Sequence, residues 1–325
     1  MNLKEIAMVS AKHIQQTVKL IFMAFLLFIN CSCVKEEMSV CAGDEEQEET
    51  FLYLKVVDSS SGEDITNSGE VDIVDLFIFK PDGCFFEHIT VSADSIMNGI
   101  PILIKGRSTK DLWVSAWGNL KGNQIVSAVT GDCKMSEMLI TLNSCNEGYA
   151  LSPDDLFFGI KQLSNATVTK ASYQEHITIS QKVARMNIIV KGLPLDISES
   201  DYFFTICDGS NGYSIEGEPI NSYVEMRQFG KFHKETDNFI TDAFNLVHAA
   251  SGDHCMTINL HYNATNVTTK AQSIIVSATK DSDGNLIAPK AGKTTNILID
   301  LTQGEEAIIS MEITPWDEIY QWVVW

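Results

Sequence analysis

The chain has 325 residues, of which 45% are hydrophobic and 20% are charged, and its formal net charge at pH 7 is −20. This negative balance argues against nucleic acid as a partner and against electrostatic adhesion to anionic lipid. The length beyond a short leader exceeds what one hydrophobic core usually serves, so two domains are expected.

The first segment has the layout of an export signal. Lys4, Lys12 and Lys19 precede an uninterrupted apolar run from Leu20 to Ile29. As a helix this run would reach about 15 Å, half the hydrocarbon core of a bilayer, so it is too short to span a membrane. A buried core helix is the alternative, which the charged residues after the run disfavour. We therefore predict a signal peptide over residues 1–32.

The apolar run ends in Asn30-Cys31-Ser32-Cys33. Lipoprotein maturation requires a small residue before the cleaved bond and a thiol after it, because the lipid is transferred to the sulfur atom. Ser32-Cys33 supplies both, whereas Cys31 follows the less suitable Asn30, so Cys33 is the preferred lipidation residue. Multiple acyl chains, palmitate among them, hold a protein far more firmly than one chain does.

An acidic segment follows the lipidation residue. Lys35, Glu36 and Glu37 resemble the Cys-x-Lys-acidic-acidic signal that sends Bacteroidota lipoproteins to the outer face of the outer membrane. Residues 33–50 continue small, polar and acidic, and such a run cannot bury enough apolar surface to order itself. We therefore predict a tether between the lipid and a surface-exposed body.

Beyond residue 50, short runs of β-branched and aromatic residues alternate with turn residues, which predicts strands. Pro81-Asp82-Gly83 is the clearest turn, since Pro fixes φ and Gly takes a positive φ. Helical periodicity is scarce, and one helical turn is expected near 242–250. Many short strands at this spacing predict an all-β fold of β-sandwiches. The expected strands are 51–57, 71–79, 112–117, 138–142, 156–160, 177–190, 202–207, 256–262, 274–279, 295–301 and 307–313.

The order strand, polar loop, strand and Asp-Gly turn occurs twice in the sequence. The first copy contains Asp82-Gly83, and the second contains Asp208-Gly209 after the strand 202–207. We therefore predict two tandem domains, 51–170 and 171–325, with a boundary near Ala171.

Outside the leader and the lipid site, the cysteines are Cys41, Cys84, Cys133, Cys145, Cys207 and Cys255. An exported chain meets an oxidising compartment. Cys133 and Cys145 flank a predicted strand, so a hairpin-like disulfide between them is a candidate. No Cys-x-x-Cys occurs, so neither a zinc knuckle nor a thioredoxin-type motif is indicated.

The sequence offers no motif that demands catalysis. The 7 histidines share no ligand spacing, and both Gly-x-Ser-x-Gly and a phosphate-binding glycine loop are absent. Asp281-Ser282-Asp283-Gly284-Asn285 resembles the start of a calcium loop, but Gly292 stands where that loop requires a Glu. A hairpin turn is expected there instead. No catalytic residue, metal or cofactor is therefore expected. Asp94-Ser95-Ile96 matches a loose O-glycosylation pattern, which is too short to decide anything.

Several segments occur in the order typical of one family. The segments are Asp75–Phe79 with Pro81-Asp82-Gly83, Trp113–Leu120, Asp154–Gly159, Val183–Ile188 and Ile313–Trp316. Together with the lipidation motif, they resemble the FimB-type fimbrial anchor lipoproteins among the Bacteroidales fimbrillin-like proteins. The resemblance covers most of the mature chain. It implies two tandem transthyretin-like (Greek-key) β-sandwiches, no catalysis, and a role in assembling a fimbrium, or pilus.

The resemblance also provides a criterion that distinguishes an anchor from a stalk subunit, namely a basic residue in the loop after the first strand. In such fimbriae a protease cuts the stalk subunit after an Arg or Lys in the loop behind its first strand, and a neighbour's C-terminal strand fills the groove that opens. No Lys or Arg occurs from Val56 to Phe79. The resemblance therefore implies an anchor that stays lipidated in the cell outer membrane, ends growth and has a fimbrial stalk subunit as its partner.

Two interpretations of the apolar segment Ile319–Trp325 remain open. It completes the sheet of the second sandwich, or Trp322, Val323, Val324 and Trp325 form a strand donated to the lowest stalk subunit. For the whole protein, the alternatives are an accessory, tip or stalk fimbrillin and a lipid-anchored glycan-binding module. Exposed, coplanar Trp or Tyr rings would favour the glycan-binding module.

Overall fold

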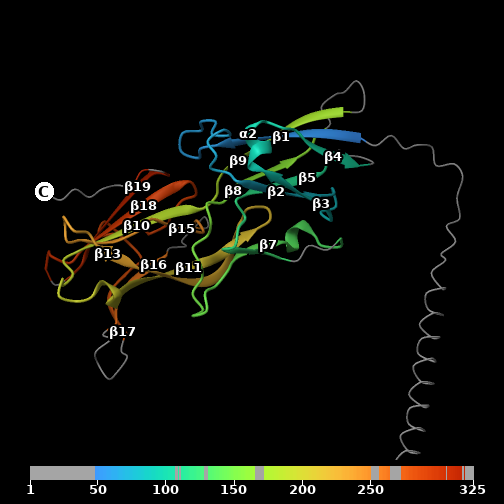
Figure 1. Cartoon of the computed structure of the whole chain (residues 1–325). Coiled ribbons are helices and arrows are strands. Elements are labelled where there is room, and N and C mark those ends of the chain that lie inside the picture. Colours follow the sequence, from blue (N-terminus) through green and yellow to red (C-terminus); the bar gives the residue numbers. More distant parts are fainter. Residues whose placement is uncertain are drawn as a thin grey trace, which may run out of the picture. The chain divides into compact units, whose positions relative to one another are not determined.

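The computed structural model describes residues 48–318, apart from 107–108, 110, 128–130, 165–171, 250–255, 264–271, 305 and 317. This part of the chain is nearly all β (Figure 1), so the predicted all-β class is confirmed. No helix among the described residues is long and apolar enough to cross a membrane. The residues predicted for lipidation, sorting and strand donation lie outside the described part: Cys33, Lys35, Glu36, Glu37, Trp322, Val323, Val324 and Trp325.

The first sheet contains seven strands. They are β1 (Glu48–Val57), β2 (Ile73–Phe79), β3 (Phe85–Ser92), β4 (Ile102–Gly106), β5 (Trp113–Gly118), β8 (Phe157–Gln162) and β9 (Ser172–Gln181), in the order β3-β2-β5-β8-β9-β1-β4. The pairing of β8 with β9 is limited to Phe157↔Gln181 and Phe158↔Ser180. Across this short pairing, apolar side chains of β2 and β5 meet those of β1, β4 and β9 in one buried cluster.

The second sheet consists of β10 (Ala184–Lys191), β13 (Gly230–Phe232), β14 (Phe239–Thr241), β15 (Phe244–Leu246), β18 (Lys293–Asp300) and β19 (Ile308–Pro315). Its order is β13-β14-β10-β18-β19, and β15 also pairs with β10. The third sheet has the order β17-β16-β11-β7-β6, with β12 also on β11. Its strands are β6 (Gln124–Val126), β7 (Leu139–Leu142), β11 (Tyr202–Ser214), β12 (Pro219–Gln228), β16 (Thr257–Asn263) and β17 (Gln272–Ala278). Short helices are α2 (Ala93–Met97), η1 (Met135–Glu137) and η2 (Glu199–Asp201).

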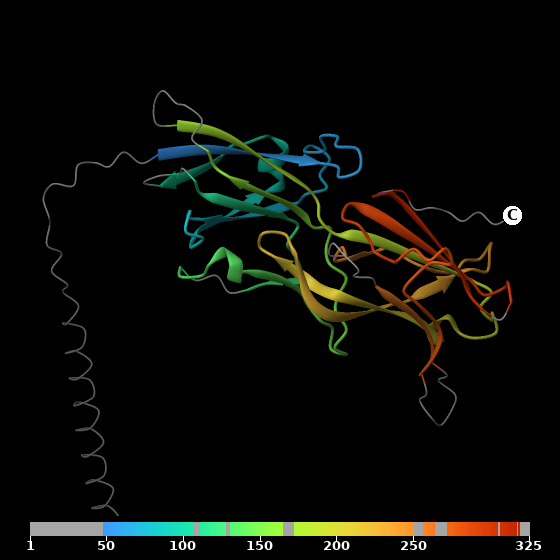
Figure 2. The ribbon, with the colours of Figure 1, turned by 180° about the vertical axis from the view of Figure 1, so that it is seen from behind.

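The third sheet joins the two halves of the chain. Tyr213 of β11 pairs with Ile140 of β7, so strands from either side of residue 171 share this sheet. Figure 2 shows the green strand β7 beside the yellow strand β11. One buried cluster accordingly contains Trp117 from the first half together with Phe204 and Ile297 from the second. The division near Ala171 stays a prediction, and the strand that follows it, β9, pairs with β1 and β8 in the first sheet.

Two turns that the sequence predicts are present in the structure. Gly83 has φ +81°, and its N–H donates to the carbonyl of Lys80 at 2.9 Å, which closes the Pro-Asp-Gly turn between β2 and β3. The carboxylate of Asp281 accepts hydrogen bonds from the N–H groups of Asp283 and Asn285 at 3.1 and 2.7 Å. These bonds form a turn around Gly284, as expected from the Asp-Gly pattern.

Three other expectations are corrected by the structure. The helical turn near 242–250 is wrong, because Phe244 and Leu246 alternate into the core on strand β15. The turn at Asp208-Gly209 is also wrong, because β11 continues through it with a register shift. Cys133 and Cys145 are free thiols, so the candidate disulfide is not formed in this structure.

Candidate functional site

The first strand is fixed inside its sheet. β1 runs parallel to β9 from Glu49↔Ser172 to Val57↔Ser180 and antiparallel to β4 from Glu48↔Gly106 to Leu52↔Ile102. Leu52 and Val56 are 0% and 1% exposed, and they pack in the cluster inside the first sheet. Removing β1 would therefore break two hydrogen-bonded ladders and open this core.

The loop after β1, residues 58–70, is shaped by its own polar side chains and is called the first loop below. Asp58 Oδ1 accepts hydrogen bonds from the N–H groups of Ser60 and Ser61 at 2.9 and 2.6 Å. Partial burial opposes ionisation of Asp58, but the hydrogen bonds from Ser61 and Ser60 outweigh it and lower the pKa of its carboxyl group. The N–H of Val56 donates to the hydroxyl of Thr66 at 2.9 Å, which folds the loop back on the end of β1.

The first loop also bonds to the second half of the chain. The N–H of Ser59 donates to Gln181 Oε1 at 2.6 Å. Ser60 Oγ donates to the carbonyl of Gly292 at 3.0 Å and accepts from the N–H of Trp316 at 3.3 Å. A Cβ atom at Gly292 would lie 2.2 Å from Ser59 Cβ, so glycine is required for this close approach. The first loop thus touches the point where the chain leaves β19.

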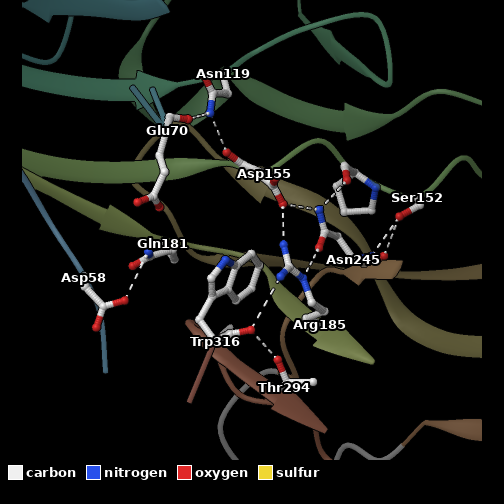
Figure 3. A network of polar contacts seen from close by, with 11 residues as sticks. Asp58, Glu70, Asn119, Ser152, Asp155, Gln181, Arg185, Asn245, Thr294 and Trp316 are labelled. Atoms are coloured by element: carbon white, nitrogen blue, oxygen red, sulfur yellow. Dashed lines mark hydrogen bonds and ion pairs between the residues drawn. The ribbon is translucent and has the colours of Figure 1, made fainter. Parts of the chain in front are cut away.

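Arg185, near the start of β10, holds this exit point (Figure 3). Its guanidinium carbon lies 4.0 Å from the centre of the Trp316 ring, and its Nη1 donates to the Trp316 carbonyl at 3.5 Å. Its Nη2 lies 3.2 Å from Asp155 Oδ1, which also accepts a hydrogen bond from Asn245 Nδ2 at 2.8 Å. Thr294 Oγ1 donates to the same Trp316 carbonyl at 2.6 Å.

A half-buried cation lies where β9 passes into β10. Lys182 Nζ lies 5.0 Å from the centre of the Phe158 ring and 5.6 Å from that of Tyr213. Burial lowers the pKa of Lys182. Burial, helped by the charge of Lys182, lowers the pKa of His248 to about 4. His248 Nδ1 lies 3.1 Å from the carbonyl of Lys182 and therefore carries the proton that it donates.

These contacts hold strands and loops in place. The part of the chain that the structure describes contains no group of three His, Cys, Asp or Glu residues that could hold a metal ion. Trp117 and Trp316 are 0% and 4% exposed, so these two rings offer no stacking platform for a sugar. The sequence predicted the first strand and its loop without basic residues, but it gave no signal for Ser59, Ser60, Gln181 or Arg185.

The strands share cores across both halves, and polar contacts tie the first loop to the chain exit. The chain belongs to the family of fimbrillin-A associated anchor proteins Mfa1 and Mfa2, whose model matches residues 41–322. This membership confirms the resemblance derived from the sequence.

Particular relatives agree with this membership. The chain is 24% identical over 299 residues to the major fimbrium anchoring subunit FimB of Porphyromonas gingivalis strain W83, a match that covers 89% of this chain and 92% of the relative. Its fold is similar to that of the fimbrial anchor protein Mfa2 from Porphyromonas gingivalis, with a TM-score of 0.60 and 14% identity over 83% of this chain and 98% of that one. These relatives are structural proteins, in agreement with the expected absence of catalysis.

Proposed function

We propose that this protein is an outer-membrane lipoprotein that anchors a fimbrium to the cell surface and terminates its assembly through β-strand addition. The family and the FimB relative support the anchoring role. The observation that carries the proposal is the position of β1 between β4 and β9, ahead of a first loop without Lys or Arg. A protease that cuts after basic residues has no site in this loop, so the lipid and the body stay in one polypeptide.

The attachment to the membrane follows from the sequence before β1. In this proposal Cys33 carries the acyl chains, Lys35, Glu36 and Glu37 direct the lipoprotein to the cell surface, and the acidic residues ahead of β1, which begins at Glu48, space the body from the membrane. The partner is a fimbrial stalk subunit. It receives Trp322–Trp325, which follow the exit point at Trp316 and lack charge.

The experiment compares Glu63→Arg with the matched control Glu63→Gln. Glu63 is exposed in the first loop, so both variants should fold. Cells are labelled with a palmitate analogue, and the acyl label is followed on a denaturing gel after exposure to a protease that cuts after Arg but not after Lys, because Lys35 lies close to the lipidated Cys33. We expect the label on the full-length chain in the wild type and Glu63→Gln, and on a short N-terminal fragment in Glu63→Arg. A wild-type body recovered without label and without β1 would identify a processed stalk subunit instead.

The donor role of the last residues has a separate test. Deleting Trp322–Trp325 should release fimbriae into the medium while leaving the lipidated protein in the membrane. Fimbriae that stay attached to cells carrying this deletion would reject strand donation by these residues.

A further inference from the structure

A groove opens on the side of the second sheet that carries β13, β14 and β15. It consists of two adjoining cavities of about 570 and 620 Å³ that share Phe229 and Asp242. Phe232 and Ile240 line the first cavity, and Phe244 and Arg185 line the second. The groove therefore combines aromatic and aliphatic side chains with charged ones, among them Lys231, Asp155 and Asp242.

Phe229 lines both cavities of the groove, and its side chain is exposed to solvent. It follows β12 and is 58% exposed, although it is a large apolar side chain. The guanidinium group of Arg227 and the ring of Phe203 lie 6.0 and 6.3 Å from the centre of its ring. An exposed aromatic ring fixed in a groove is typical of a surface that binds another apolar segment.

The segment of the sequence that follows Glu318 is apolar. Ile319-Tyr320-Gln321-Trp322-Val323-Val324-Trp325 contains no charged residue. The chain approaches it through Trp316, whose ring stacks on Arg185, and Arg185 lines the second cavity. At Trp316, three residues before the segment, the chain thus lies one side chain away from the groove.

The distance is within reach of the segment. From β19 to β13, which directly follows Phe229, the path crosses β18, β10 and β14, which is four strand spacings or about 19 Å. When extended, the six residues from Trp316 to Trp322 span about 20 Å and the nine to Trp325 about 30 Å. Residues 319–325 can therefore cross the sheet and place Trp322 or Trp325 on Phe229.

We propose that the groove is the docking site of residues 319–325 of the same chain whenever no fimbrial subunit holds them. Docking covers the exposed Phe229 ring and the aromatic rings of the tail together, which removes both from water. The carboxylates of Asp155 and Asp242, which line the second cavity, provide acceptors for the indole N–H groups. Only the identity of the competing occupant rests on the proposed function, because docking is a property of the isolated chain.

The test uses the purified mature chain without any fimbrial subunit. A photoreactive benzoylphenylalanine replaces Trp322, and cross-linked peptides are mapped by mass spectrometry. We expect intramolecular links to residues 229–245 and at least a fivefold lower yield in Phe229→Ser. The matched control is Tyr223→Ser, since Tyr223 is 70% exposed on β12 but does not line either cavity.

Three outcomes would overturn the docking. Links that map to the free edge of β19, or equal yields in Phe229→Ser and the wild type, would place the tail elsewhere. Links that join two chains on a denaturing gel would assign the groove to a second copy. Since strand donation is judged by fimbriae retained on cells, failure of either proposal leaves the other open to its own test.

Discussion

Arg185 connects three segments that are far apart in the sequence. Its planar guanidinium contacts Asp155, Asn245 and Trp316 at the same time (Figure 3). A lysine ammonium keeps the positive charge but lacks both the planar fork and the stacking surface. The geometry of these contacts therefore depends on arginine rather than on charge alone.

We expect Arg185→Lys to lower the free energy of unfolding by about 1–2 kcal/mol, because hydrogen bonds at Trp316 and Asp155 are lost. Urea unfolding followed by far-UV circular dichroism measures this change. The control is Lys80→Arg at an exposed turn residue, which should change stability by less than about 0.5 kcal/mol. Equal effects of the two substitutions would show that the Arg185 geometry contributes nothing.

His248 predicts how stability depends on pH. Its folded pKa of about 4 lies below the ordinary value of 6.5, because burial disfavours the charged ring. As the pH falls, the unfolded chain binds the proton first. Stability is therefore unaffected by this group above pH 6.5 and declines by up to about 1.4 kcal/mol per pH unit between pH 6.5 and 4.

The variant His248→Gln isolates this contribution. Glutamine cannot titrate, so the loss of stability between pH 6.5 and pH 4 should be smaller in the variant than in the wild type. Burial also lowers the pKa of His261, which both proteins retain, so the difference between them reports His248 alone. Chemical unfolding at several pH values gives the two slopes, and parallel slopes would contradict the prediction.

At the scale of elements, the pairing of β11 with β7 leaves no room for a side chain at Gly212. Gly212 lies opposite Thr141, and a Cβ atom there would be 2.0 Å from the carbonyl oxygen of Ile140. We expect Gly212→Ala to destabilise the protein by about 3 kcal/mol, because backbone must move to admit the methyl group. Thermal unfolding measures this loss of stability. At Gly122 nothing lies within 4 Å of an added Cβ, so Gly122→Ala is the near-neutral control.

Strands with a strong local pattern were predictable, and strands defined by distant partners were not. The alternation over 51–57 and the Pro-Asp-Gly turn placed β1 and the β2–β3 hairpin. The pattern near 242–250 suggested a helical turn, yet pairing with β10 makes Phe244–Leu246 a strand. At Asp208-Gly209 a local turn signal is overridden, because β11 is paired on both sides of it.

The contacts of the candidate functional site were likewise predictable only where they depend on local sequence. The lack of Lys and Arg in the first loop can be read from the sequence. The bonds of Ser59 to Gln181 and of Ser60 to Gly292 join residues 122 and 232 positions apart, and serine in a polar loop carries no sign of such a partner. Those contacts become visible only when the sheets are assembled.

At the scale of the whole molecule, the shared core predicts cooperative unfolding. Ser115 Oγ and Trp117 Nε1 both donate to the carbonyl of Ile215, at 2.5 and 3.1 Å, so the two halves share buried polar contacts as well as apolar ones. We expect one calorimetric transition for the body, since neither half can open without exposing that core. Two resolved transitions, one of them retaining the near-UV signal of Trp117, would contradict a shared core.

The placement of β1 bears on how the body resists mechanical tension. Tension applied between Trp316 and Glu48 would draw β1 lengthwise past β9 and β4. Under such shear the bonds of both ladders carry the load together, whereas peeling from one end would break them in succession. Single-molecule stretching between Glu48 and Glu318 should therefore meet a higher rupture force than stretching across the strands.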